Sequence, residues 1–377
     1  MSGPHHPGRR RRLLALAALV AFALLAGCSG DSRPSAATSP ATQATAAAAA
    51  TTPPTTRTTA VAGPRQPTGS PVTLAFGGDV HFEGVIESRL ARDPATAVGP
   101  IAPVLRQADL AMVNLETAVT TRGTPAVKDF IFRAPPSAFT ALSAAGIDLA
   151  TMANNHGEDF GVVGVRDSLA AAAAAKFKVV GIGLDADQAY RPHVVTVKGQ
   201  RIAVIGATQV LDASLAAAWT AGPGKPGLAS AYQESRLLAA VRAARRAATT
   251  VVVFLHWGKE RSTCPISRQR ALAPRLVAAG ADVVVGSHAH VLVGSGFLDG
   301  AFVNYGLGNF VFYARGGLGA QTGVLTLTVR GRAVTGVRWT PAVISGGVPV
   351  PLTGSGAERA AAAWRALRGC TGLAANP

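Results

Sequence analysis

The stretch Val72-Thr73-Leu74-Ala75-Phe76-Gly77-Gly78-Asp79-Val80-His81 joins a strand signal to two side chains that bind metals. The first five residues favour a β-strand, and the glycine pair ends that strand just before the carboxylate. Because side chains alternate along a strand, Asp79 and His81 point to the same side and can reach one metal ion. A single Asp-x-His pair is a weak signal, and a surface loop is the alternative. The interpretation therefore depends on the ends of the other strands.

Polar residues of the same kinds stand at the ends of four more predicted strands. The carboxyl ends of parallel strands in an α/β sheet meet in one crevice, so we expect these side chains to converge on Asp79 and His81. A helix cap, a core imidazole or a turn is the structural alternative at each position taken alone. The residues are Glu116 after strand 110–114, Asn155 and His156 after strand 149–152, His256 at the end of strand 251–256, and His288 and His290 after strand 283–285.

This mixture of ligands indicates a particular class of metal. Imidazole with carboxylate suits Mn, Fe, Zn or Co better than Ca or Mg. Two divalent ions close together need a bridging oxygen ligand, which a carboxylate supplies, and they polarise a phosphoryl group and activate water near neutral pH. We therefore predict a site for two divalent transition-metal ions.

From residue 71 onward, strands alternate with helices. Helical patterns cover residues 101–107, 137–145, 162–175, 232–247 and 267–279, and residues 194–197 and 201–205 form a predicted hairpin. After Gly300 short strands take over, at 301–304, 310–313, 323–329 and 334–339. The pattern predicts an α/β domain over residues 71–350, an αββα sandwich of two packed sheets with helices outside, followed by a carboxy-terminal helix and tail over residues 351–377.

The amino terminus has the pattern of a lipoprotein signal peptide. Four arginines at positions 9–12 precede an apolar run over residues 13–26, which is too short for a comfortable membrane span. Leu25-Ala26-Gly27-Cys28 resembles a bacterial lipobox. We predict a signal peptide over residues 1–27, lipidation of Cys28 and an extracytoplasmic protein anchored to the cell membrane. Ordinary secretion with an incidental Cys28 is the alternative.

Residues 28–70 are rich in Ala, Thr, Ser and Pro and show no apolar periodicity, which predicts a disordered tether. The two remaining cysteines, Cys264 and Cys370, would then lie in an oxidising compartment, where we expect them to form a disulfide. Two buried free thiols are the alternative.

Charge and motifs exclude several classes of protein. The formal net charge is +16, but no basic block or aromatic-interleaved basic stripe lies in the predicted domain, which argues against nucleic-acid binding. The excess favours attraction to an anionic cell-surface polymer, unless it only reflects a genomic preference for Arg. We find no Gly-x-Ser-x-Gly elbow, Walker loop, Cys-x-x-Cys pair or complete dinucleotide-binding loop.

Six blocks of sequence together resemble the CapA family of bacterial capsule and poly-γ-glutamate synthesis proteins, within the calcineurin-like metallophosphoesterase superfamily. The resemblance spans roughly residues 71–345 and implies an αββα fold of that superfamily type. The blocks are Gly78-Asp79-x-His81, Asn114-Leu115-Glu116, Asn154-Asn155-His156-x-x-Asp159-x-Gly161, His256-Trp257-Gly258-x-Glu260, Gly286-Ser287-His288-x-His290 and Gly306-Leu307-Gly308-Asn309-Phe310.

The resemblance also implies roles for individual residues. Asp79, His81 and His290 would bind the first metal, Glu116 would bridge, and Asn155, His256 and His288 would bind the second metal. His156 would be the catalytic acid, with Asp159 orienting it. Arg133 and Glu260 would face the substrate.

Two departures from the family pattern bear on these roles. Many members have an apolar residue where His81 stands, and the superfamily usually has Asp where Glu116 stands. We expect a metal-dependent hydrolase acting on a phosphoester or an anionic cell-surface polymer. The alternative is a non-catalytic accessory of a membrane polymer synthase or exporter that binds an anionic polymer.

Overall fold

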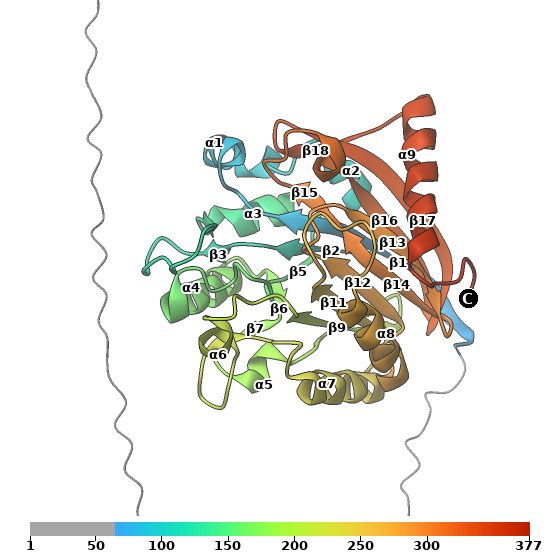
Figure 1. Ribbon diagram of the computed structural model, residues 1–377, viewed down its shortest axis with the longest axis horizontal. Coiled ribbons are helices and arrows are strands. Elements are labelled where there is room, and N and C mark those ends of the chain that lie inside the picture. Colours follow the sequence, from blue (N-terminus) through green and yellow to red (C-terminus); the bar gives the residue numbers. More distant parts are fainter. Residues whose placement is uncertain (1–64) are drawn as a thin grey trace, which may run out of the picture. The chain divides into compact units, whose positions relative to one another are not determined.

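The structure is a computed structural model that describes residues 65–377, and it consists of two β-sheets packed face to face with helices on the outer sides (Figure 1). This arrangement confirms the predicted αββα sandwich. One sheet runs in the order β18 (Val348–Pro351), β17 (Ala333–Ser345), β16 (Gln321–Gly331), β1 (Pro67–Val80), β2 (Leu110–Leu115), β5 (Leu149–Thr151) and β6 (Lys178–Val180), with β15 (Asn309–Val311) also pairing with β1. The other runs β13 (Leu292–Leu298), β14 (Ala301–Leu307), β12 (Val283–Ser287), β11 (Thr250–His256), β9 (Gln200–Thr208) and β8 (His193–Val197).

Alternation along the strands explains why the two sheets pack. On β1, Val72, Leu74 and Phe76 are fully buried and belong to the cluster shared with Val252 and Phe254 of β11. The intervening Ala75 belongs to a different cluster, which includes helix residues. The central strands are thus buried on both faces, as expected where helices cover a largely parallel sheet.

Helices cover the outer face of each sheet (Figure 1). Their apolar residues pack on the strands, as Leu237 and Val241 of α7 do in the cluster that includes Val253 of β11. The helices are α1 (Val85–Arg92), α2 (Ala102–Leu105), α3 (Ser137–Ala144), α4 (Gly161–Ala174), α5 (Ala186–Ala189), α6 (Ala216–Trp219), α7 (Glu234–Ala247), α8 (Ser267–Ala279) and α9 (Gly354–Ala366), with 3-10 turns η1 (Pro94–Thr96), η2 (Gly317–Ala320) and η3 (Leu367–Cys370). Two-residue strands complete the fold: β3 (Ala118–Val119) pairs with β4 (Arg133–Ala134), and β7 (Ile182–Gly183) with β10 (Gly227–Leu228).

The strands that carry the predicted site residues run parallel. β1, β2 and β5 are parallel neighbours in one sheet, and β9, β11 and β12 are parallel neighbours in the other. The site therefore lies where the carboxyl ends of strands from two sheets meet. The sequence predicted that the side chains converge in one crevice, without assigning the strands to separate sheets.

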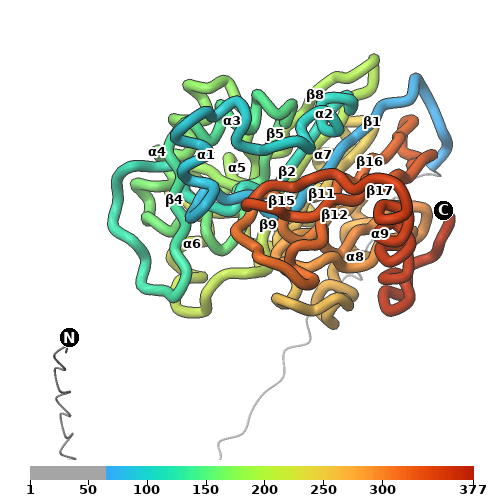
Figure 2. Tube along the Cα trace, turned by 90° about the horizontal axis from the view of Figure 1, so that it is seen from above, coloured from blue at the N-terminus to red at the C-terminus, as the bar shows by residue number. Residues whose placement is uncertain are grey.

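The last strands return antiparallel and close the first sheet. β16 pairs with β1 and with β17, so segments more than 200 residues apart in sequence lie side by side (Figure 2). α9 packs against this part of the fold through Trp364, whose ring stacks on Trp339 with centroids 5.0 Å apart.

The predicted hairpin is confirmed as β8 and β9, which pair antiparallel. Several elements were not predicted from the sequence, among them α1, α5, α6, β13 and β18, and β1 begins at Pro67, whereas the predicted domain begins at residue 71.

Two glycines allow β1 and β15 to approach each other beside the site. A Cβ on Gly78 would lie 1.9 Å from the carbonyl oxygen of Gly308, and that carbonyl accepts a hydrogen bond from the Asp79 amide at 2.9 Å. Gly308 itself has a φ of 66°, which favours glycine. The Gly306-Leu307-Gly308-Asn309-Phe310 block therefore fixes the end of β1.

None of the helices formed by residues 65–377 is long and apolar enough to cross a membrane. The predicted signal peptide, the lipidation of Cys28 and most of the predicted tether fall on residues outside those that the structure describes.

A disulfide joins Cys264, in the loop before α8, to Cys370 in η3, with their Cα atoms 5.7 Å apart. The two cysteines are 106 residues apart in sequence, so the bond closes a long loop and restricts the unfolded chain.

We predict that replacing both cysteines by alanine lowers the free energy of unfolding by about 2–4 kcal/mol, because the unfolded chain regains the entropy of that loop. Urea unfolding of the purified chain measures the change. Reduction of the wild-type protein is the control and should give the same loss. Unfolding midpoints that do not change in either experiment would contradict the prediction.

Candidate metal centre

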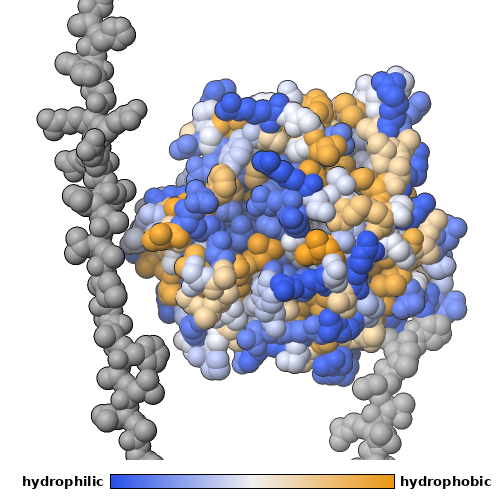
Figure 3. Space-filling model, viewed as in Figure 1, coloured by the Kyte–Doolittle hydropathy of each residue, from blue (hydrophilic) through white to orange (hydrophobic). Residues whose placement is uncertain are grey.

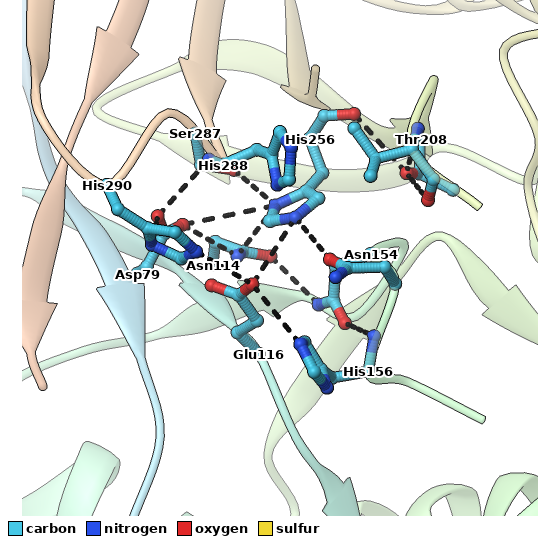
Figure 4. Close-up of polar contacts among 12 residues, drawn as sticks. Asp79, Asn114, Glu116, Asn154, His156, Thr208, His256, Ser287, His288 and His290 are labelled. Carbon is cyan, nitrogen blue, oxygen red and sulfur yellow. Dashed lines mark hydrogen bonds and ion pairs between the residues drawn. The ribbon is translucent and has the colours of Figure 1, made fainter. Parts of the chain in front are cut away.

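Glu116, just beyond the end of β2, lies at the middle of the predicted site (Figure 4). Its carboxylate oxygen Oε1 is 3.4 Å from Nε2 of His256, 3.8 Å from Nε2 of His290 and 4.0 Å from Nε2 of His156. Glu116 is fully buried, and burial together with the neighbouring Asp79 raises the pKa of its carboxyl group well above its ordinary value. Three imidazoles from three different segments thus face one carboxylate.

Asp79 is held beside Glu116 by hydrogen bonds at both of its oxygens. Asn114 Nδ2 donates to Oδ1 at 2.8 Å, and the backbone N–H of His288 donates to Oδ2 at 3.1 Å. Asn154 Nδ2 in turn donates to Asn114 Oδ1, which fixes the orientation of the Asn114 amide. The carboxylate of Asp79 is therefore oriented by contacts from both sheets.

His290 is oriented by Asn309, which begins β15. Asn309 Nδ2 donates to the backbone carbonyls of His290 and Gly319, so its Oδ1 is left to accept from Nδ1 of His290, 2.8 Å away. This contact keeps a proton on Nδ1 and directs the lone pair of Nε2 toward Glu116. Such partners set the tautomer of metal-binding histidines.

His256 and His288 complete the ring of imidazoles, with ring centroids 4.7 Å apart. His256 Nε2 lies 2.7 Å from Oδ1 of Asn155, and its Nδ1 lies 3.0 Å from the Ser287 hydroxyl. Burial lowers the pKa of His288 to about 3 and that of His256 well below its ordinary value, so both rings are neutral. Neutral imidazole is the form that binds a metal.

The backbone at His288 and His290 is unusual. Both residues have positive φ angles, 89° and 54°. Non-glycine residues seldom adopt this conformation, and where they do so the strain often belongs to a functional site.

Buried atoms without partners test whether these residues fit a metal. Both carboxylate oxygens of Glu116 and Nδ1 of His288 are buried and form no hydrogen bond with any residue of the described chain. Leaving such groups unpaired costs free energy, whereas a cation satisfies them. Three groups of side chains have ligand atoms within 4.8 Å of one another: Asp79 with Glu116 and His290, Glu116 with His256 and His288, and Glu260 with His288 and His290. The donor set fits a divalent transition metal.

His156 lies at the edge of this centre and contacts Asp159. Its Nδ1 is 2.6 Å from Oδ2 of Asp159, which leaves Nε2 free on the side of Glu116. Asp159 Oδ1 also accepts a hydrogen bond from Lys128, and Phe132 stacks on the His156 ring with centroids 4.0 Å apart. Burial lowers the pKa of His156, and Asp159 opposes that change.

A cavity of about 760 Å³ opens beside the centre, and His156, His290 and Asn155 lie in its wall. The wall combines aromatic rings with charges of both signs. It includes Phe130, Phe132, Phe312 and Tyr313, the cations Lys128, Arg261 and Arg315, and the acids Asp129, Asp212 and Glu260. The face of the molecule in Figure 3 likewise intersperses hydrophilic and hydrophobic residues.

The family model of the bacterial capsule synthesis protein PGA_cap matches residues 73–314, which include every member of this centre. The chain belongs to the PGA_cap family. It is 31% identical to the PGA biosynthesis protein CapA of Bacillus subtilis over 64% of this chain and 63% of that protein, and 32% identical to the "Probable polyglutamine synthesis accessory protein" of Mycobacterium tuberculosis over 48% of this chain and 50% of that protein. The matched part thus spans less than two thirds of these relatives.

A solved phosphatase from Mycoplasma pneumoniae aligns with a TM-score of 0.46 and 16% identity, covering 73% of this chain and 95% of that chain. With these values the likeness is slight, and it assigns no role to any residue of the site.

Two predicted site residues lie near the centre but outside the groups of ligand atoms and the cavity wall. His81 joins none of the three groups of ligand atoms, because its ring packs among Phe132, Phe312 and Tyr313. Arg133, on β4, is not among the residues that line the cavity, and its guanidinium lies 3.6 Å from the centroid of the Phe160 ring. Glu260 does line the cavity, and a carboxylate oxygen of Glu260 lies within 4.8 Å of ring nitrogens of His288 and His290.

Sequence reasoning missed two residues that position the site. Asn309 stands in the block Gly306-Leu307-Gly308-Asn309-Phe310, for which the sequence analysis gave no residue a role, although an Asn directly after Gly308 at a strand end is itself a signal. Lys128 has no such signal, because it lies in a loop without periodicity. Its buried ammonium group contacts Asp159 and the carbonyl of Asn155, and lies 5.2 Å from the centroid of the Trp219 ring.

We predict that Asn309→Ala weakens metal binding about 10- to 100-fold, because His290 loses the acceptor that fixes its tautomer. Titration with Mn²⁺, followed by the electron paramagnetic resonance signal of the free ion, measures the affinity. Asn304→Ala, at another buried asparagine, is the control for general effects on the fold. Equal affinities in Asn309→Ala and wild type would show that Asn309 does not position His290.

We also predict that metal binding releases a proton and tightens as the pH rises from 7 to 9. Burial alone would lower the pKa of His290, but Glu116 and Asp79 outweigh it and raise the pKa to about 9. His290 is therefore protonated below pH 9 in the metal-free chain, and the ion must displace that proton. Calorimetry with Mn²⁺ in buffers of different ionisation enthalpy measures the release, and affinity that does not change between pH 7 and 9 would refute it.

Proposed function

We propose that this chain is a metal-dependent hydrolase that cleaves a phosphoester-type bond outside the cytoplasm, in the synthesis of a capsule or of poly-γ-glutamate. The observation that carries the proposal is the buried, unpaired carboxylate of Glu116, which faces three imidazoles next to a cavity. The context of polymer synthesis comes from the family and from the names of the relatives.

Two divalent ions among Mn, Fe, Zn and Co are the cofactors that we propose. When bound, such ions polarise the scissile group and activate water. Glu116 would be shared between them, with Asp79 and His290 on one side and Asn155, His256 and His288 on the other. The groups of ligand atoms around Glu116 support this division.

His156 would supply the proton that the leaving oxygen needs. Asp159 accepts from Nδ1 of His156 and stabilises the charged ring, and Nε2 is the atom that would hold the transferable proton. Phe132 covers one face of the ring and donates its backbone N–H to Asp159, so the pair is held rigidly. Lys128 places a positive charge 3.0 Å from Oδ1 of Asp159, on the other side of the carboxylate from the imidazole's partner oxygen.

The cavity would accept an anionic substrate. The bound ions, together with Arg261 and Arg315 in the wall, would attract a phosphate or a carboxylate, and the aromatic rings would contact the rest of the molecule. A lipid anchor at Cys28 would hold the domain at the outer surface of the cell membrane, where such polymers are assembled.

A second function is supported by the name of the relative from Mycobacterium tuberculosis, a probable accessory protein. In that case the chain would bind an anionic polymer through its metals and arginines and assist a membrane polymer synthase or exporter, without cleaving any bond.

We predict that the purified chain, supplied with Mn²⁺, hydrolyses p-nitrophenyl phosphate or bis-p-nitrophenyl phosphate, and that His156→Ala lowers the rate about 10²- to 10⁴-fold. The reason is that the variant loses the proton that Nε2 of His156 would give to the leaving oxygen. Release of p-nitrophenolate measures the rate.

His193→Ala is the matched control, because His193 lies on β8 away from the cavity and should leave the rate unchanged. A chain that binds Mn²⁺ but cleaves neither ester nor poly-γ-glutamate would favour the accessory function over the hydrolase.

A further inference from the structure

His81 is enclosed by aromatic rings and is 0% exposed. Its ring centroid lies 4.6 Å from that of Phe132, 4.1 Å from that of Phe312 and 4.5 Å from that of Tyr313. These rings also form the wall of the cavity, so His81 lies behind the wall rather than in it.

The hydrogen bond at Nδ1 determines which nitrogen of His81 carries the proton. The backbone N–H of Glu83 points at Nδ1 from 3.0 Å, and an N–H group can only donate. Nδ1 must therefore be the acceptor, so the neutral ring carries its proton on Nε2. A nitrogen that carries a proton has no lone pair to offer a cation, which leaves neither nitrogen of His81 available as a ligand.

Glu260 brings a carboxylate to the side of the centre on which His288 and His290 lie. It follows β11, and the next residue, Arg261, donates its backbone N–H to the carbonyl of Ala289 at 2.8 Å. This hydrogen bond ties the Glu260 loop to the His288-Ala289-His290 segment. A carboxylate oxygen of Glu260 lies within 4.8 Å of ring nitrogens of both His288 and His290.

We propose that Glu260, and not His81, is the metal ligand that completes this centre beside His288 and His290. Two imidazoles and one carboxylate form a donor set typical of transition-metal sites with open positions. The buried, unpartnered Nδ1 of His288 supports a ligand site on this side. Glu260 thereby takes a role in metal binding instead of contacting the substrate, and His81 becomes a packing residue. The Nε2 of His81 is buried and has no hydrogen-bond partner among the described residues, but it carries the proton of the neutral ring.

This inference rests on the proposed function, because it concerns the same metal site. It predicts which residues bind the metal and makes no statement about catalysis. The experiment compares the affinity for Mn²⁺ and the visible spectrum of the Co²⁺-loaded chain among wild type, Glu260→Gln, His81→Asn and Asp129→Asn. Glutamine keeps the size of Glu260 and removes the charge. Asparagine at position 81 keeps an acceptor for the Glu83 N–H and removes Nε2. Asp129→Asn removes an exposed carboxylate from the same cavity and controls for charge.

We expect Glu260→Gln to weaken Mn²⁺ binding about tenfold or more and to change the Co²⁺ spectrum, while His81→Asn and Asp129→Asn leave both as in wild type. Thermal unfolding of each variant establishes that it is folded. Wild-type affinity and spectrum in Glu260→Gln, or an equal loss in Asp129→Asn, would overturn the role of Glu260. A loss of affinity in folded His81→Asn would overturn the exclusion of His81. A wild-type chain that binds neither ion would refute the metal site itself and the hydrolase with it.

Discussion

A carboxylate without a hydrogen-bond donor is the constraint on which the site depends. Glu116 is fully buried, and ring nitrogens of His256, His290 and His156 lie 3.4 to 4.0 Å from its Oε1. Burying a charge in this way costs several kcal/mol unless a partner is present, and burial holds the rings of His256 and His288 neutral. A divalent cation would offset this cost, because it pairs with the carboxylate and accepts the lone pairs of the rings.

The fold produces this arrangement by bringing the ends of two sheets together. β1 and β2 deliver Asp79 and Glu116 from one sheet, while β11 and β12 deliver the histidines from the other. Asn309, on a strand that pairs with β1, reaches His290 in the segment after β12. The positive φ angles at His288 and His290 indicate that the backbone accepts strain to direct these rings inward.

Much of this could be predicted from the sequence, for a physical reason. A strand buried on both faces shows as an apolar run, and a charged or imidazole side chain directly after it must lie at the carboxyl edge of the sheet. Spacing alone predicted that Glu116 and His256 lie close together, and Nε2 of His256 is 3.4 Å from Oε1 of Glu116 in the structure. Spacing cannot show which partner a ring nitrogen has. His81 follows β1 as a ligand would, but the Glu83 amide and the aromatic rings around it depend on the three-dimensional packing. The position of Arg133 could not be predicted for the same reason. Its contact with the Phe160 ring depends on three-dimensional packing, which the spacing of residues in the sequence does not show.

Anomalous diffraction from crystals of the purified chain, collected on both sides of the Mn, Fe, Co and Zn absorption edges, tests the central claim most directly. The account predicts at least one strong peak between the Glu116 carboxylate and the rings of His256, His288 and His290, with an element-specific edge. Two observations together, in well-ordered crystals grown with these ions present, would contradict the account. The first is the absence of an anomalous peak at this position, and the second is a Glu116 carboxylate that pairs only with protein groups.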